Sequence, residues 1–241
     1  FAVMSFVWGA CIGSFLNVCI HRIPRDLSVV APRSFCPSCN KMIPWYLNIP
    51  LVSWIILRAK CRFCGTHIAA RYFIVEGLTA ILFLLVWMKF GFELGPRPLD
   101  LVAVDQWPLV PVYWLMVSGL ILGTFVDFEH LIIPDRVTLG GIVAGLILSP
   151  LIPAMHGESG ALYGLMWSAV GAAVGGGILW TIGLVGTFVF KREAMGFGDV
   201  KYLGMIGGAV GPWGAVVALV VAAFTGSVAG FVRVLVTRDR Y

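Results

Sequence analysis

Three aspartates stand directly beside long apolar segments, where an ionisable side chain is unusual. Asp127 follows the apolar run YWLMVSGLILGTFV, Asp135 follows a proline, and Asp199 follows Gly196 and Gly198 in the sequence GFGD. Ionisable groups at membrane depth are costly and are candidates for function, although groups at the ends of spans can reach water. Two carboxylates brought together from different helices could share a proton, one acting as base on a water molecule and the other as acid toward a carbonyl oxygen. The pattern therefore permits acid–base hydrolysis without proving it.

Each of these acids also has a purely structural interpretation. Asp199 could cap a helix that begins at Val200, with the two glycines before it forming a turn. Asp135 has the sequence context of a helix start after a proline. Asp127 could be a solvated loop acid, and the motif GxGD is weak by itself. Spacing alone therefore leaves catalysis and these structural roles open.

Four cysteines form two CxxC motifs, CPSC at 36–39 and CRFC at 61–64, separated by 21 residues. This spacing is close to that of four-thiolate zinc sites, in which each motif lets two sulfurs converge on one ion. Four protein ligands fill a tetrahedron and leave no position for water, so the sequence predicts a structural site. Disulfides and unligated thiols are the alternatives, and a reducing cytoplasm counts against disulfides. The predicted zinc ligands are Cys36, Cys39, Cys61 and Cys64.

The segments that position these groups are strongly apolar. The 241 residues are 59% hydrophobic and 12% charged, about half the charged fraction of an ordinary soluble domain, and the mean hydropathy is +0.94. A helix needs about 20 apolar residues to cross a bilayer, so the sequence predicts an all-α polytopic membrane protein, a bundle of about seven to eight transmembrane helices. Apolar runs place spans at 1–20, 73–90, 109–126, 137–155, 161–190, 200–211 and 213–236.

One sizeable polar insertion, residues 21–72, interrupts these spans. It carries eight basic residues against a single acid, Asp26, and the positive-inside bias therefore places it in the cytoplasm. Counting spans from there puts the acidic loop 93–106 outside and all three candidate aspartates at the cytoplasmic face. The predicted organisation is a first transmembrane helix at 1–20, a cytoplasmic zinc-binding insertion at 21–72, and a transmembrane core at 73–241.

The net charge of +5 reflects this topology, and no basic face with interleaved aromatics indicates nucleic acid as a partner. The lipid bilayer is the partner that composition predicts. Pairs of glycines four residues apart, Gly171 with Gly175 and Gly226 with Gly230, suit close helix contact in lipid, and we interpret them as packing residues. On that interpretation Gly171→Ala should change activity little.

Taken together, several motifs in their order along the chain resemble the type IV prepilin peptidase family, also called leader peptidase/N-methyltransferases, which are GxGD membrane aspartic proteases. The resemblance covers nearly the whole chain. Its motifs are GSFLNVCIHRIP (13–24), CPSC, IPLVSW (49–54), CRFC, RYFIVE (71–76), DFEHLIIPD (127–135) and GFGDVK (196–201).

The resemblance implies roles for individual residues. The two catalytic aspartates of the family match Asp127 and Asp199. Asp135 and Lys201 also match family positions and are assigned supporting roles. Gly196 and Gly198 would let the backbone of the substrate come close to Asp199, and 73–241 would be the aspartic peptidase core.

The activity that the resemblance implies is that of a bacterial inner-membrane endopeptidase. It would remove short basic leaders from prepilins or pseudopilins at the cytoplasmic face. N-methylation of the new amino terminus with S-adenosylmethionine would follow. This chain departs from the family at Ala59, where the family usually carries Gly, and at Phe73, where it often carries Pro. No Gly-rich nucleotide loop is present, so the residues that would bind S-adenosylmethionine are unassigned.

Two other classes of protein fit part of the pattern. A transporter could use membrane acids as an ion or proton relay, but it would more often place them near the midplane, and the cysteine motifs would be unexplained. A zinc-dependent membrane scaffold could dock a cytoplasmic partner without catalysis. Cleavage of a leader peptide in detergent, and its loss on replacing an aspartate, would discriminate among the three.

Overall fold

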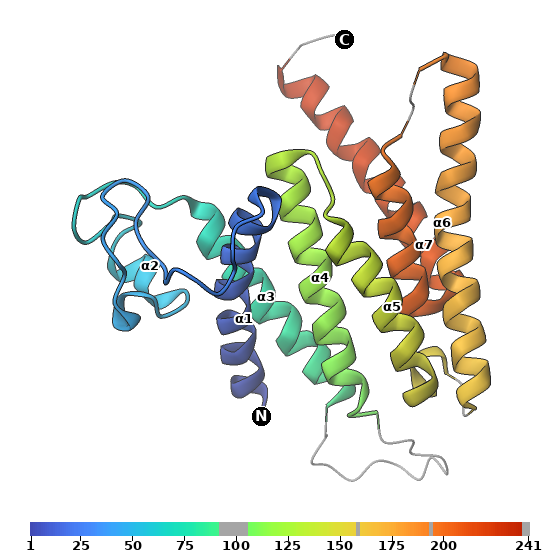
Figure 1. Cartoon of the computed structure of the whole chain (residues 1–241), viewed down its shortest axis with the longest axis horizontal. Coiled ribbons are helices and arrows are strands. Elements are labelled where there is room, and N and C mark those ends of the chain that lie inside the picture. Colours follow the sequence, from blue (N-terminus) through green and yellow to red (C-terminus); the bar gives the residue numbers. More distant parts are fainter. Residues whose placement is uncertain (92–105, 158–159, 193–194, 238–241) are drawn as a thin grey trace. The chain divides into compact units, whose positions relative to one another are not determined.

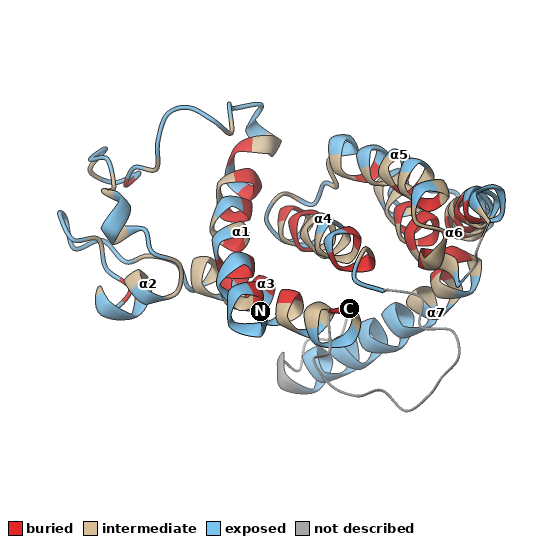
Figure 2. Cartoon of the chain, turned by 90° about the horizontal axis from the view of Figure 1, so that it is seen from below, coloured by how far each residue is buried: buried red, intermediate tan, exposed pale blue. Residues whose placement is uncertain are grey.

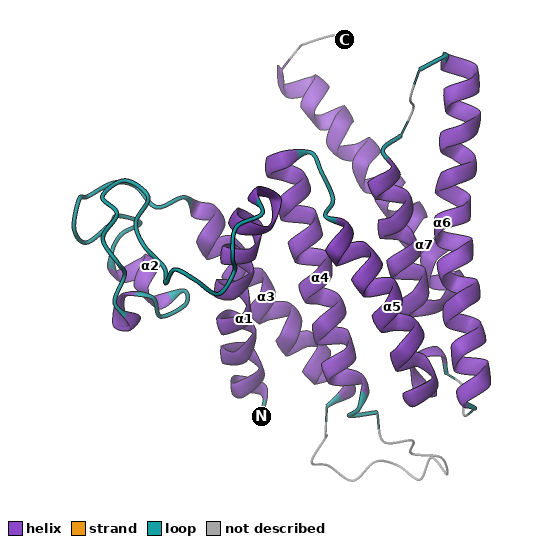
Figure 3. Ribbon diagram, in the orientation of Figure 1, coloured by secondary structure: helices purple, strands orange, loops and turns teal. Residues whose placement is uncertain are grey.

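The computed structural model describes residues 1–91, 106–157, 160–192 and 195–237, and the regular elements in those ranges are helices (Figures 1 and 3). Most of the predicted external loop 93–106 lies outside the described residues. The elements are α1 (Ala2–Arg22), η1 (Ile23–Arg25), η2 (Trp45–Leu47), α2 (Val52–Ile56), α3 (Ala70–Phe90), α4 (Leu109–His130), α5 (Asp135–Leu151), η3 (Pro153–His156), α6 (Ala161–Phe190) and α7 (Phe197–Thr237).

Five helical segments in the described ranges are long and apolar enough to cross a membrane. They are Ala2–Arg25, Ala70–Phe90, Leu109–His130, Ala161–Phe190 and Phe197–Leu235. The sixth long helix, α5, has 17 residues. The prediction of an all-α, multi-pass membrane protein is confirmed.

The last helix contains two of the predicted spans. Gly211 has φ 79° and ψ 175°, which is not helical, and Pro212 follows it. A positive φ favours glycine, and proline removes a backbone donor, so α7 bends here. The two legs correspond to the spans predicted at 200–211 and 213–236, and the seven predicted spans therefore occupy six helices.

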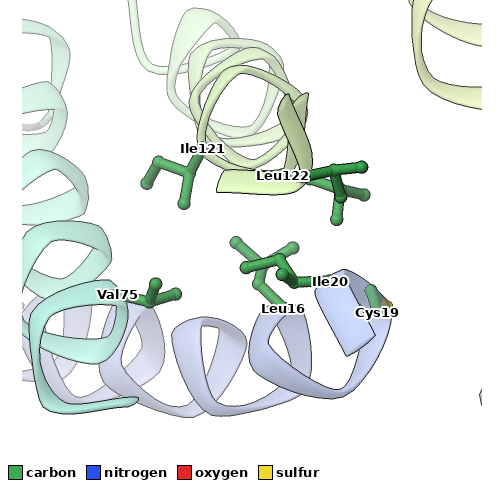
Figure 4. Close-up of a cluster of buried hydrophobic side chains, with 7 residues drawn as sticks. Leu16, Cys19, Ile20, Val75, Ile121 and Leu122 are labelled. Carbon is green, nitrogen blue, oxygen red and sulfur yellow. The ribbon is translucent and has the colours of Figure 1, made fainter. Parts of the chain in front are cut away.

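The chain divides into two compact units, Phe1–Val137 and Thr138–Tyr241. In the first unit, α1, α3 and α4 enclose a buried apolar cluster. Leu16, Cys19 and Ile20 from α1 meet residues from the other two helices, as Figure 4 shows. The cluster is completed by Val75, Ile121, Leu122 and Val126. In Figure 2 the segment around α2, by contrast, is largely exposed.

Glycines set the distance between α1 and α3. A Cβ added to Gly13 would lie 2.7 Å from the Cα of Glu76, and one added to Gly9 would lie 2.8 Å from the Cα of Ala80. Real Cβ atoms do not approach backbone this closely, so only glycine permits the contact. The GSFLN motif therefore packs directly on the RYFIVE motif.

The second unit is packed in the same way along α6 and α7. A Cβ added to Gly171 would lie 2.8 Å from the backbone carbon of Gly207, and one added to Gly175 would lie 2.5 Å from the carbonyl oxygen of Leu203. The packing interpretation of this pair is confirmed. The expectation that Gly171→Ala changes activity little assumed a tolerant packing face, but the obstacle to an added methyl group is rigid backbone. Gly226 and Gly230 have nothing within 4 Å of an added Cβ, so that pair does not pack within the described chain.

Candidate active site and cysteine cluster

Asp127 lies in the last turn of α4, three residues before its end at His130. Its carbonyl oxygen accepts a hydrogen bond of 2.8 Å from the backbone N–H of Leu131, whose φ of 53° turns the chain out of the helix. The Asp127 side chain is partly exposed, and the preceding Val126 is fully buried. The first candidate acid is therefore held on a packed helix and is not a loop residue.

Charged side chains tie the end of α4 to its neighbours in the same unit. Glu129 forms an ion pair with Arg71 at the start of α3, and the two side chains are 33% and 15% exposed. His130 Nε2 lies 3.4 Å from Nη1 of Arg25, which also donates a hydrogen bond of 2.6 Å to the carbonyl oxygen of His21. Partly exposed ion pairs contribute at most about 1 kcal/mol each. Their main effect is to fix the helical turn that carries Asp127.

Asp135 is the first residue of α5 and is exposed. The backbone N–H of Val137 donates a hydrogen bond of 3.0 Å to the carbonyl oxygen of Pro134, which closes the first turn. An acidic side chain at this end of a helix is favoured by the helix dipole. The interpretation of Asp135 as a helix-start residue is confirmed.

Asp199 is the third residue of α7, which begins at Phe197. A capping role for Asp199 would require the helix to begin at Val200. The helix begins three residues earlier, so Asp199 lies within its first turn and is not its cap. The backbone N–H of Asp199 donates a hydrogen bond of 3.2 Å to the carbonyl oxygen of Gly196. The Nζ of Lys201 lies 5.1 Å from the centre of the Phe197 ring, within the range of a cation–π contact.

The glycines beside Asp199 stand at the helix start. Gly196 directly precedes α7 and Gly198 is its second residue. A Cβ added to Gly196 would lie 3.6 Å from Oδ2 of Asp199, an ordinary contact. Asp127 and Asp135 belong to the first unit, and Asp199 belongs to the second. The joint action of Asp127 and Asp199 stays a prediction.

The first cysteine motif forms a tight turn closed by backbone hydrogen bonds. Asn40 N–H donates to the carbonyl oxygen of Cys36 at 2.8 Å, and Cys36 N–H donates to that of Lys41 at 3.0 Å. Ile43 N–H donates to the carbonyl oxygen of Ser34 at 2.9 Å. Asn40 has φ 53°, a conformation that asparagine tolerates better than most residues. Backbone alone thus shapes this turn.

The second motif repeats this turn 25 residues later, hydrogen bond for hydrogen bond. Gly65 N–H donates to the carbonyl oxygen of Cys61 at 3.0 Å, Cys61 N–H to that of Thr66 at 2.8 Å, and Ile68 N–H to that of Ala59 at 2.7 Å. Gly65, in the place of Asn40, has φ 73°. Ala59 has φ 57°, in the left-handed region that favours glycine, which explains the glycine expected there from the resemblance.

The two turns bring the four sulfur atoms within 4.8 Å of one another. Cys36 Sγ and Cys64 Sγ are 3.8 Å apart. Four sulfurs at about 2.3 Å from a tetrahedral zinc would be separated by about 3.8 Å, so the cluster fits that ion closely. The cysteine cluster, defined as Cys36, Cys39, Cys61 and Cys64, is therefore a group that could hold a metal.

The thiols of the cluster differ in how readily they ionise. Hydrogen bonds with the side chain and backbone of Thr66 lower the pKa of Cys64 to about 6. The backbone of Lys41 lowers the pKa of Cys39, but burial and hydrogen bonds with Cys36 and Cys64 outweigh that effect and raise it to about 11. Metal binding requires thiolates, so occupation would release protons.

Two buried polar side chains that sequence reasoning missed connect segments of the first unit. Glu76 joins the insertion to α3, and Asn17 joins α1 to α3. Glu76 on α3 is 8% exposed, and its Oε2 accepts a hydrogen bond of 2.7 Å from the backbone N–H of Leu51. Asn17 on α1 donates from Nδ2 to the carbonyl oxygen of Tyr72 at 3.1 Å. Trp54 packs on Phe73 with ring centres 4.9 Å apart. Polar residues within apolar spans were the signal that could have identified Asn17 and Glu76.

The carboxylate of Glu76 supports a strained turn. Leu51 has φ 63° and ψ −50°, and the N–H of Val52 donates across it to the carbonyl oxygen of Pro50 at 2.7 Å. This is a γ-turn of the rare, strained kind, with a typical cost of about 1–3 kcal/mol. The hydrogen bond from Leu51 to the Glu76 side chain offsets part of that cost, because a typical hydrogen bond contributes about 0.5–1.5 kcal/mol. The motifs at 49–54 and 71–76 thus contact each other directly.

Two family models match the chain, a bacterial peptidase A24 N-terminal domain over residues 7–90 and the type IV leader peptidase family over residues 114–231. A prepilin leader peptidase/N-methyltransferase of Myxococcus xanthus is 42% identical over 98% of this chain and 64% of its own length. Proteins of the same name from Aeromonas hydrophila and Neisseria gonorrhoeae are each 31% identical, over 96% and 99% of this chain and 81% and 83% of their own lengths. No solved structure matches.

Proposed function

Because this chain belongs to the type IV leader peptidase family, we propose that it is a membrane aspartic endopeptidase that removes the short basic leader from type IV prepilins or pseudopilins. The observation that carries the proposal is the likeness, over nearly the whole chain, to relatives named prepilin leader peptidase/N-methyltransferase. The same likeness supports subsequent N-methylation of the new amino terminus, with S-adenosylmethionine as the methyl donor.

In the proposed reaction Asp127 and Asp199 act as one pair. One carboxylate takes a proton from a water molecule while the water oxygen attacks the carbonyl carbon of the scissile peptide bond. The protonated partner gives its proton to the carbonyl oxygen. The tetrahedral gem-diol then collapses: one of its hydroxyl groups returns a proton to the carboxylate that had acted as the acid, and the C=O bond re-forms. The C–N bond breaks as the leaving amine takes a proton from the carboxyl group that had acted as the base. Asp135, Gly196, Gly198 and Lys201 support this site without carrying a proton.

The proposed arrangement places the chain in the bacterial inner membrane with the active site facing the cytoplasm. Residues 1–20 are the first transmembrane helix, 21–72 the cytoplasmic zinc-binding insertion, and 73–241 the peptidase core. The eight basic residues of the insertion support this orientation. Structural zinc bound by the cysteine cluster would fix the two turns relative to each other.

The direct test is to mix the purified protein in detergent with a prepilin and S-adenosylmethionine and to record the mass of the product. We expect loss of the leader and the gain of one methyl group. Cleavage without an ion gradient would exclude transport as the primary function. An unchanged prepilin, with the protein folded and lipid present, would overturn the proposal.

Gly198→Val should reduce cleavage by about a hundredfold, because a misplacement of about 1 Å at a reacting centre costs that much. A branched side chain next to Asp199 would hold the substrate backbone away from the carboxylate. The matched control is Gly226→Val in the second leg of the same helix, where an added Cβ meets nothing within 4 Å. Leader removal is compared at equal membrane levels. Full activity in Gly198→Val would mean that GFGD is only a helix start.

Freshly purified protein should contain one zinc ion per chain, measured by elemental analysis. Cys36→Ser should lose it and loosen residues 30–70, because metal-linked folding is local to the ligands. Cys11→Ser is the control, since Cys11 is an exposed cysteine outside the cysteine cluster. Equal zinc in wild type and Cys36→Ser would contradict the assignment.

A further inference from the structure

The segment 45–56 of the insertion displays large apolar side chains to the surroundings. Five of them, Trp45, Tyr46, Val52, Ile55 and Ile56, are called the apolar edge here. Trp45 is 80% exposed and Ile56 is 72% exposed. Val52, Ile55 and Ile56 are spaced i, i+3 and i+4 along α2 and therefore share one face of that helix. A water-soluble surface does not ordinarily concentrate such residues.

Contacts with α3 fix the depth of this edge relative to the membrane-spanning helices. The backbone of Leu51 is bonded to Glu76, and Trp54 packs on Phe73. Glu76 lies six residues past the start of α3 at Ala70, which is about 9 Å along the helix axis at 1.5 Å per residue. The segment that carries the apolar edge therefore lies alongside a membrane-spanning helix, below its end.

A hollow beside α1 gives a similar depth. Asn48 and Pro50 line a hollow of about 370 Å³ together with Cys11 and Ser14 of α1. Ser14 lies eight residues before the end of α1 at Arg22, which is about 12 Å along the axis. Within this unit, Figure 1 likewise shows α2 beside α1 and not beyond its end.

The charged residues that flank the apolar edge in sequence are all basic. Between Asp26 and Glu76 the chain contains no acidic residue. Four basic residues flank the edge in sequence, Lys41 on one side and Arg58, Lys60 and Arg62 on the other. Aromatic rings at headgroup level, apolar side chains below them and flanking cations are the features of segments that lie in the interface of an anionic bilayer.

We propose that residues 45–56 dock in the headgroup region of an anionic bilayer, so that the insertion that carries the cysteine cluster rests in the membrane interface. The apolar edge is then covered by lipid, and the flanking cations meet lipid phosphates. This inference does not depend on the catalytic activity. It refines the prediction of a polar cytoplasmic insertion, because part of residues 21–72 becomes a lipid-contacting surface.

The test is site-directed spin labelling of the full chain in nanodiscs that contain anionic lipid. Trp45→Cys and Ile56→Cys are made in a background with Cys11→Ser and Cys19→Ser, and each variant is checked for zinc. Collisions of the label with oxygen, which enters lipid, are compared with collisions with a water-soluble nickel chelate. We expect oxygen collisions to exceed nickel collisions severalfold at both positions.

Asp26→Cys is the matched control, because the Asp26 side chain is 89% exposed and follows the end of α1 and η1. Its label should collide more often with the nickel chelate than with oxygen. Nickel collisions at positions 45 and 56 equal to those at 26 would overturn the proposal. That outcome would mean that the apolar edge stands in water and is built for a protein partner or a second copy of the chain.

Discussion

Asp127→Asn and Asp199→Asn should each reduce prepilin cleavage by a factor of about 10³ or more, and the double variant should be no slower than either single one. The reason is that water attack on an amide needs one ionised and one protonated carboxyl acting in the same step. Replacing either aspartate already abolishes the joint catalytic step. Replacing the second one therefore causes no further loss of rate. Initial rates of leader release from a purified prepilin give all three values.

The control for this experiment is Asp135→Asn. Asp135 is exposed and starts α5, so its replacement should leave more activity than Asp127→Asn. The reverse order would mean that the first catalytic acid has been misassigned. Two modest losses that add in the double variant would show that the aspartates act independently. All variants should retain membrane insertion and zinc, since neither carboxylate lies in the cysteine cluster.

The helices were predictable because each is determined by the residues of a single continuous stretch of sequence. An uninterrupted apolar run of about 20 residues can satisfy its backbone in lipid only as a helix, and the runs at 73–90, 109–126 and 161–190 are helices in the structure. The bend in α7 was also visible as Gly211 followed by Pro212. Helix ends were less predictable. The helix of Asp199 starts at Phe197, and Asp127 lies inside α4.

The cysteine cluster was predictable for a related reason. Each CxxC turn is closed by backbone hydrogen bonds within ten residues. The conformation of each turn is therefore determined by local sequence. The contact of Glu76 with Leu51 joins residues 25 apart, and no local sequence pattern predicts it. The sequence also does not distinguish the glycines that contact the backbone of another helix from those that face outward. Such contacts depend on which helices become neighbours.

Gly171→Ala should lower the stability of the second unit by about 3 kcal/mol or more, at the upper end of the cost of overpacking. The added methyl group would meet the backbone of Gly207, and also the backbone carbon of Gly211 at 2.9 Å. A flexible side chain could move away, but two helix backbones can only separate. Separation would also disturb Gly175, whose added Cβ would already lie 2.5 Å from the carbonyl oxygen of Leu203.

Gly226→Ala is the matched control, because it makes the same chemical change in a helix where an added Cβ meets nothing within 4 Å. Alanine is favoured over glycine in a helix by about 1 kcal/mol, so this variant should be as stable as wild type or slightly more stable. Helix propensity alone predicts that alanine stabilises the helix at both positions. Only the steric contact makes the change destabilising at Gly171. Thermal unfolding in one detergent, followed by helicity, gives the comparison. Equal midpoints for the two variants would show that α6 and α7 are not packed through their glycines.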